Sequence, residues 1–295
     1  MQAKQVFAGL IAFGQSKQQV KQAAGAEWDR THPEGITKQQ YINNALRDKI
    51  YSYKTYKNYA KQNNYFFRWC RDNYKCKTLA QCREHVNEYL QSRIDSGYAA
   101  HTIKLQAAAL AKLYQCSSAE FIATPARHRA NIVRSRGTAA RDRNFSAKRN
   151  KDLIDFCMGT GLRRSELKIL RPEQLRETEN GYYLVIKGKG GKVREAPIIG
   201  QNVAEIVQKI KNTQPGQKVW SKIHSCADIH NYRALYATQI YKMHARAPEK
   251  IPKKDKYFCK KDLQGVLLDK QAMLAASNAL GHNRIDVVAN NYIRL

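Results

Sequence analysis

Apolar residues recur at the spacing of an α-helix through the first half of the chain. One helix face is formed by Tyr56, Tyr59, Asn63, Phe67 and Cys70. Two more amphipathic runs follow, at 79–90 and 103–113, and the pair Ser96-Gly97 separates them. Lysines and arginines lie between the apolar positions. Residues 46–121 are therefore predicted to form a compact helical domain with a basic surface.

The pattern changes after residue 146. Residues 182–187 and 193–199 are strand-like, and a glycine-rich turn at 188–192 joins them, which predicts a β-hairpin. Ser146 is placed to cap a helix that continues to Met158. Further helices are expected around 203–210, 231–244, 272–280 and 286–292, and a short hairpin within 257–268. The predicted fold class is mainly α with a small antiparallel β-sheet (α+β).

The charge narrows the choice of partner. The 295 residues contain 52 Lys and Arg against 24 Asp and Glu, a formal net charge of +28. Such an excess favours a polyanion, and DNA, RNA or an anionic membrane would suit it equally well. Apolar residues make up 43% of the chain, which is typical of a folded protein. No apolar run approaches the roughly 18 residues of a membrane-spanning helix, so we expect no membrane partner.

The seven cysteines are an odd number and include no CxxC pair, which favours reduced thiols and a cytoplasmic protein. Cys76, Cys82 and His85 lack a fourth ligand at a usual zinc spacing, so no metal site is predicted. The apolar stretch at 6–14 is followed by lysines and many glutamines. We interpret it as part of an amphipathic helix and not as a secretion signal.

These observations divide the chain into four parts. Residues 1–45 are expected to form an N-terminal helical appendage, either an arm that contacts DNA or a packing element. Residues 46–121 form the helical domain, 122–145 a basic interdomain linker, and 146–295 the second domain.

Two basic clusters are candidate DNA-binding segments. Around the linker, where apolar periodicity stops, they are Arg127, Arg129, Arg134, Arg136, Arg141 and Arg143. In the hairpin turn, Lys187, Lys189 and Lys192 could reach phosphates from a flexible tip. A linker that is merely solvated, and a hairpin that only contacts backbone phosphates, are the simpler alternatives.

Two arginines stand where an anion could bind. Arg163 follows a glycine-containing helix break at 159–161, where backbone N–H groups and a guanidinium make an anion site. Glu166 lies one turn further and could orient Arg163. His230 and Arg233 are three positions apart and so share a helix face, where one could move a proton while the other holds a phosphate oxygen. Taken singly, Arg163 is better interpreted as a surface arginine, and His230 as a helix-cap or core histidine.

The end of the chain adds a potential nucleophile. His282 follows Gly281, a natural helix stop, and Tyr292 lies in the last predicted helix. A tyrosine can hold a phosphoryl group covalently. Its ordinary pKa is about 10, so attack at neutral pH needs cations and a base nearby. A partly buried core phenol is the simpler interpretation of Tyr292 alone.

Taken together, these segments resemble the tyrosine recombinase (phage-type integrase) family. The matching stretches are TGLRRSEL at 160–167, KGKGGK at 187–192, HNYR at 230–233, and LGHNR at 280–284 with Tyr292. The clear resemblance covers about 146–295. Residues 46–120 resemble the family's helical core-binding domain more loosely.

The resemblance implies roles for the matching residues. Tyr292 would be the nucleophile that forms a 3′-phosphotyrosine and frees a 5′ hydroxyl. Arg163 and Arg233 would stabilise the pentavalent phosphate, and His230 would assist proton transfer to and from Tyr292. In the same way, Lys189 would be the general acid for the leaving 5′ oxygen.

His282 would donate a hydrogen bond to a non-bridging phosphate oxygen. The implied architecture is a helical core-binding (SAM-like) DNA-binding domain followed by a tyrosine-recombinase (DNA breaking-rejoining) catalytic domain. The implied activity is site-specific recombination of double-stranded DNA that integrates or excises a mobile element or prophage. It requires no metal and no cofactor, because the phosphotyrosine keeps the bond energy.

The implied partners are specific recombination sites, three further copies of the chain in a homo-tetramer, and an accessory DNA-bending or directionality factor at the nucleoid. The basic stretch at 245–270 is interpreted as an insertion that contacts DNA or a neighbouring subunit. A type IB-like topoisomerase and a catalytically silent DNA-binding factor are the alternatives.

Overall fold

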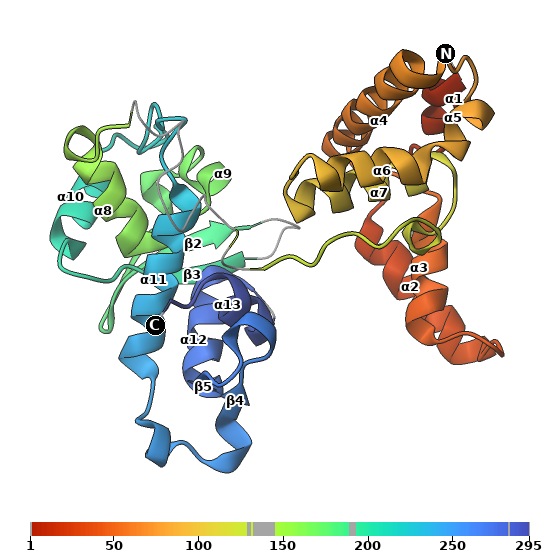
Figure 1. The fold of residues 1–295 in the computed structure, drawn as a ribbon. Helices are drawn as coiled ribbons and strands as arrows, with labels where there is room; N and C mark the ends of the chain where they lie inside the picture. The colour runs from red at the N-terminus through yellow and green to blue at the C-terminus, as the bar shows by residue number, and fades with distance from the viewer. Residues whose placement is uncertain (1, 129–130, 132–144, 189–192, 283, 295) are drawn as a thin grey trace. The chain divides into compact units, whose positions relative to one another are not determined.

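The computed structural model describes residues 2–128, 131, 145–188, 193–282 and 284–294. The chain divides into two compact units, Met1–Arg127 and His128–Leu295, which are described separately. Helices dominate both, and small antiparallel sheets complete the second unit, which confirms the predicted fold class (Figure 1). In the described part of the chain, no helix combines the length and the apolar character that a membrane crossing requires.

The first unit is built from helices. They are α1 (Gln2–Gly9), α2 (Lys17–Thr31), α3 (Lys38–Arg47), α4 (Tyr53–Tyr74), α5 (Leu79–Glu84), α6 (Val86–Asp95) and α7 (Ala100–Leu113). Local capping sets several of these boundaries. Thr37 and Thr78 each form a reciprocal capping box with the glutamine three positions later, and Ser52 caps α4 through the amide of Thr55.

The core of this unit lies where α4, α6 and α7 meet. Phe66 of α4 is fully buried and packs against Tyr89 of α6, with 5.1 Å between the ring centroids. Ile103 and Leu110 of α7 complete the centre of this core. The N-terminal helix α1 also belongs to it through the buried side chain of Phe7. Helices α2 and α3, by contrast, pack mainly against each other.

The second unit combines helices with two small sheets. Its helices are α8 (Lys151–Thr160), α9 (Arg164–Leu167), α10 (Val203–Lys211), α11 (Ile229–His244), α12 (Lys270–Leu280) and α13 (Ile285–Asn291). Its strands are β1 (Leu175–Thr178), β2 (Gly181–Lys187), β3 (Val193–Pro197), β4 (Lys256–Phe258) and β5 (Leu267–Asp269).

The predicted hairpins are confirmed, because β2 pairs with β3 and β4 pairs with β5, both antiparallel. Strand β1, which the sequence pattern did not reveal, extends the first sheet to the order β1-β2-β3. In the β2–β3 register, Ile186 pairs with Arg194 and Leu184 with Ala196. All four side chains are buried, so this face of the hairpin is turned to the core.

Helix α11 lies between α8 and α12 and joins the two apolar clusters of the unit (Figure 1). Its Tyr236 ring packs directly on Gly161, the residue that ends α8 with φ +60°. A Cβ at position 161 would lie 2.2 Å from that ring. Both the left-handed backbone and the close approach therefore require glycine at this position.

Two local predictions need correction. Helix α8 begins at Lys151, and the Ser146 hydroxyl instead accepts a hydrogen bond from the amide of Arg149 in a preceding 3-10 turn. Helix α13 ends at Asn291, so Tyr292 is the residue that follows the helix and not a member of it. The backbone at Tyr292 departs from helical geometry, with φ −120° and ψ −44°.

Candidate active site

The start of α9 positions Arg163. The backbone N–H of Arg163 donates to Glu166 Oε2 at 2.7 Å, and its guanidinium donates to Glu166 Oε1 at 2.6 Å. Glu166 thus caps the helix and holds the arginine that precedes it. The side chain of Arg163 keeps 28% of its surface exposed, whereas that of Glu166 keeps 4%. Arg163 can therefore reach a ligand while its partner carboxylate stays inside.

The start of α11 contributes His230 and Arg233. Asp228 caps this helix by accepting a hydrogen bond from the amide of Asn231 at 3.2 Å. Arg233 lies one turn further and is 2% exposed. Its guanidinium donates to the carbonyl oxygens of Gly161 and Leu280. Burial and the nearby Arg163 lower the pKa of Arg233 to about 10, so it is still charged at neutral pH.

The C-terminal end of α12 gathers three guanidiniums from other elements. The Leu280 carbonyl accepts from Arg233 at 2.6 Å and from Arg163 at 3.3 Å, and the Ala279 carbonyl accepts from Arg194 Nε at 3.0 Å. The last carbonyls of a helix have no partner within the helix and carry partial negative charge. They therefore attract the arginines of α9, β3 and α11 to one point.

His282 follows this helix end. Gly281 ends α12 in the left-handed conformation, and the His282 amide donates back to Ser277. The Nε2 atom of His282 is buried and has no hydrogen-bond partner among the described residues. Burial, together with Arg233, Arg163 and Arg194, lowers the pKa of His282 to about 4. The imidazole is therefore neutral at pH 7 and can offer a single N–H to an anion.

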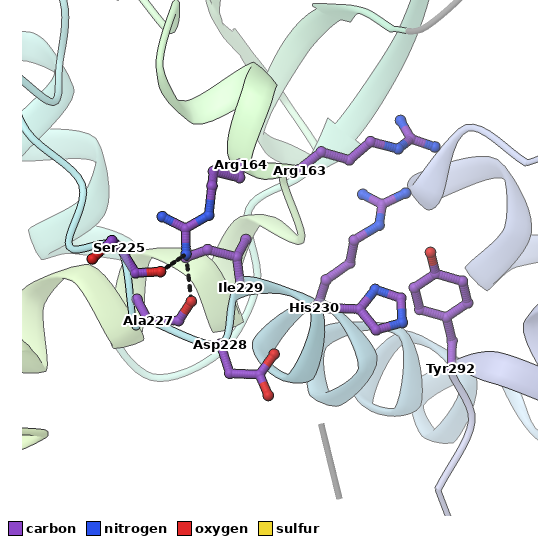
Figure 2. Close-up of a pocket in the computed structure, with 9 residues that line it drawn as sticks. Arg163, Arg164, Ser225, Ala227, Asp228, Ile229, His230 and Tyr292 are labelled. Carbon is purple, nitrogen blue, oxygen red and sulfur yellow. Dashed lines mark hydrogen bonds between the residues drawn. The ribbon is translucent and has the colours of Figure 1, made fainter. Parts of the chain in front are cut away.

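Tyr292 completes the arrangement. Its ring centroid lies 5.1 Å from that of His230 and 5.2 Å from that of His282, and the Arg233 guanidinium carbon is 5.6 Å from it. The residue is only 7% exposed. In Figure 2 the Tyr292 hydroxyl points toward the side of the pocket that contains the Arg163 guanidinium, and the His230 ring lies beside it.

These side chains border one pocket of about 380 Å³. It is lined by Arg163, Arg164, Ser225, Ala227, Asp228, Ile229, His230, Arg233 and Tyr292. Arg164 holds the pocket wall in place, because its guanidinium donates to the carbonyl of His224 at 2.9 Å and also to those of Ser225 and Ala227 (Figure 2). The pocket therefore brings together a phenol, an imidazole and guanidiniums in one partly open space.

The structure brings together most of the catalytic candidates from the sequence. Arg163, His230, Arg233 and Tyr292 line the pocket, and His282 lies against the Tyr292 ring. Other predicted residues, Lys189, Lys192, Arg129, Arg134, Arg136, Arg141 and Arg143, lie outside the described residues. Arg127 and Lys187 are described and exposed. The roles of all these residues stay predictions.

One buried member of the cluster was missed in the sequence. Arg194 of β3 is 7% exposed and places both terminal nitrogens on Glu166, at 3.0 and 2.8 Å. Burial alone would raise the pKa of Glu166, but hydrogen bonds from Arg194 and Arg163 lower it to about 2. The signal was the alternation of β3, in which Arg194 shares the inward face with Ala196.

Among the described residues, no group of three or more His, Cys, Asp or Glu is arranged to hold a metal ion, and this includes Cys76, Cys82 and His85.

Comparison with known proteins agrees with this architecture. Residues 39–120 match the family model described as the phage integrase N-terminal SAM-like domain. The XerH site-specific recombinase, solved in a post-cleavage complex with a palindromic difH substrate, is 15% identical, with a TM-score of 0.51 over 100% of this chain and 90% of that one. The Tn1549 transposon integrase, solved in complex with circular intermediate DNA, is 13% identical, with a TM-score of 0.45 over 94% and 95%.

No curated protein matches the sequence significantly. The predicted resemblance to the tyrosine recombinase (phage-type integrase) family is confirmed, by the family model for the SAM-like domain and by the XerH recombinase for the fold.

Proposed function

We propose that this protein is a site-specific DNA recombinase that cleaves and rejoins strands through a covalent phosphotyrosine at Tyr292. The observation that carries the proposal is the placement of the Tyr292 phenol within one chain: two imidazole rings lie about 5 Å from its own ring, and it faces the guanidinium of Arg233. A phenol with guanidiniums and imidazoles at hand is arranged for nucleophilic attack on a phosphodiester.

In the proposed reaction, the Tyr292 oxygen attacks the phosphorus and the bond to the 5′ oxygen breaks. His230 takes the phenolic proton, and Lys189 gives a proton to the leaving 5′ oxygen. Arg163 and Arg233 stabilise the negative charge that develops on the non-bridging oxygens. Guanidiniums suit this role because their planar fork can donate to two oxygens at once. Rejoining reverses each transfer, so the phosphotyrosine conserves the bond energy.

The charge around the pocket supports a phosphate ligand. His282 is neutral at pH 7. Its Nε2 atom is buried and has no hydrogen-bond partner among the described residues, so it can donate to a non-bridging oxygen. Arg163, Arg164, Arg194 and Arg233 carry four positive charges, against Glu166 and Asp228 among the described residues at this site. A phosphodiester brings one negative charge into this excess.

The first unit offers a second surface for DNA. The face of α4 opposite the core is exposed and basic, with Lys54, Lys57, Lys61, Arg68 and Arg71. We assign this face, together with the linker arginines, to contacts with backbone phosphates, which position a protein on DNA without reading its sequence.

The proposal extends to a homo-tetramer on two duplexes, assisted by a DNA-bending or directionality factor, that moves a mobile element or prophage in the cytoplasm.

Covalent trapping tests the proposal. A pool of nicked duplexes with randomised sequence is incubated with the protein, and adducts that survive denaturant are recovered, sequenced and mapped by mass spectrometry. We expect a 3′-phosphoryl group on Tyr292 and a preferred sequence. Tyr292→Phe should give no adduct, whereas Tyr182→Phe, which removes a phenol bonded to Glu177 on the sheet of the same unit, should react as the wild type does.

Three outcomes separate the alternatives. If the folded wild type forms no adduct, the protein is a DNA-binding factor without this chemistry. An adduct without sequence preference, together with fast relaxation of supercoiled plasmid, would identify a topoisomerase. An adduct at a defined site that proceeds to strand exchange supports the recombinase.

A further inference from the structure

Arg194 is built into the site without lining the pocket. Its side chain is 5% exposed and makes a two-pronged contact with Glu166, while its Nε donates to the Ala279 carbonyl at 3.0 Å. A single side chain thus joins β3, the start of α9 and the end of α12. Lysine could not replace all three contacts, because an ammonium is a point charge without a planar fork.

Each contact leads to a residue of the proposed chemistry. Glu166, held by Arg194, in turn binds both the amide and the guanidinium of Arg163. The backbone around Gly281 rests on the Arg194 stem so closely that a Cβ at Gly281 would lie 2.6 Å from Arg194 Cδ. His282 is the next residue. The position of Arg194 therefore determines where both Arg163 and His282 stand.

We infer that Arg194 is a positioning residue, which sets Arg163 through Glu166 and sets His282 through the 279–281 backbone, without touching the DNA itself. This inference rests on the proposed recombinase function. It predicts that altering Arg194 slows strand cleavage far more than it weakens DNA binding, because a displacement of about 1 Å at the reacting groups can cost ~10²-fold in rate.

The experiment compares Arg194→Lys and Arg194→Gln with Arg176→Gln. Arg176 is a matched control, since it pairs with Glu195 on the same sheet but both side chains are about half exposed. Three quantities are measured: thermal unfolding, affinity for the trapped DNA site, and the single-turnover rate of covalent adduct formation per folded molecule. Both Arg194 variants should bind DNA within ~3-fold of the wild type and react ~10²-fold more slowly. The control should bind DNA and react as the wild type does.

A titration of His282 followed by NMR in histidine-labelled protein supplies a readout independent of activity. His282 faces Arg163 and Glu166 near α9, Arg194 on β3, Arg233 on α11 and Tyr292 after α13. Arg194→Gln removes one of these positive charges, so the pKa of His282 should rise, whereas Arg194→Lys retains the charge and should leave it low.

Each result decides the matter. Adduct rates equal to the wild type in both variants would overturn the inference. Variants that are unfolded at the assay temperature would also overturn it, because Arg194 would then contribute to stability alone. If the wild type forms no adduct, the proposed function fails. The titration then decides on Arg194 by itself, and an unchanged His282 pKa in Arg194→Gln refutes the positioning role.

Discussion

Two clusters of arginines and carboxylates in the second unit differ in their balance of charge. Cations outnumber carboxylates in one, and carboxylates outnumber cations in the other. In the first, Glu166 is the carboxylate that holds Arg163 and Arg194, and Arg233 lies beside them. In the second, Arg246 alone bridges two carboxylates, Asp269 at 2.6 Å and Asp255 at 2.9 Å.

The second cluster is closed within the protein. Asp269 is fully buried, caps α12 and accepts from Arg246, so it joins the end of α11, the β4–β5 hairpin and the start of α12. Its charges leave no positive excess. The cluster anchors the predicted 245–270 insertion to the rest of the unit.

The first cluster has more cations than protein carboxylates among its described members, and it opens on a pocket. A buried positive excess is costly unless an anion joins it. Burial, and after it the same excess of cations, lowers the pKa of His282. The balance of charge therefore distinguishes a structural anchor from a candidate ligand site, although the contacts look alike residue by residue.

The largest expected effect lies in the open cluster. Arg233→Lys should slow adduct formation by ~10²–10³-fold under single-turnover conditions, because removing one fixed donor to a developing charge typically costs that much. Arg246→Lys is the matched control and should react at the wild-type rate per folded molecule. A Arg233→Lys protein that keeps more than a tenth of the wild-type rate would remove the distinction between the clusters.

The closed cluster should respond in stability. Arg246→Gln leaves Asp269 buried without its cation, and breaking such a pair by removing one partner costs about 3 kcal/mol when both groups are well buried, less here because Arg246 is partly exposed. Urea unfolding measures this loss, and the cleavage rate of the remaining folded protein should be unchanged. A stable but inactive variant would contradict the assignment of this cluster to structure.

Acid should distinguish the clusters by the pH at which each loses stability. The folded-state pKa of His282, about 4, lies below its ordinary value of 6.5. The contribution of the neutral imidazole to the free energy of unfolding is therefore complete above pH 6.5 and is lost as the pH falls toward 4. Hydrogen bonds from Arg246 lower the pKa of Asp269 from 3.8 to about 2, so its contribution is lost only below pH 3.8.

Between pH 5 and 6.5, therefore, His282→Gln should remove part of the decline in the free energy of unfolding, up to about 2 kcal/mol at pH 5 and less where solvent screens the half-buried ring. Asp269→Asn should lower the free energy of unfolding throughout the range above pH 4, and it should change the slope of the pH dependence only below pH 4. Urea titrations at a series of pH values compare the two variants, and equal slopes for wild type and His282→Gln above pH 5 would refute the buried neutral imidazole.

The smallest effect belongs to an exposed pair of the same chemistry. Arg176→Gln removes the partner of Glu195, and exposed pairs contribute roughly 0.5 kcal/mol or less. Thermal unfolding should barely change, and adduct formation should not. A clear loss of either would show that burial is not what separates the clusters from the surface.

Local patterns predicted most elements, because helical and alternating periodicity depends on neighbours along the chain. They also indicated four of the residues that line the pocket, Arg163, His230, Arg233 and Tyr292, since motifs such as HNYR at 230–233 keep their chemistry wherever they are placed. Strand β1 was missed. The choice between an arm and a packing element for residues 1–45 was left open, because the short apolar segment at 6–14 does not reveal which residues it packs against; the structure places Phe7 of α1 in the first core.

By itself, the amino-acid sequence determined the mainly helical class, the β2–β3 hairpin, the basic charge and the set of reactive side chains. Tertiary structure alone decided that three arginines from α9, β3 and α11 meet the last carbonyls of α12, and that Tyr292 turns to them after leaving α13. The reason is physical. The packing of α11 against Gly161 and α12 brings these helix ends together, and no spacing within one segment specifies a contact between segments so far apart.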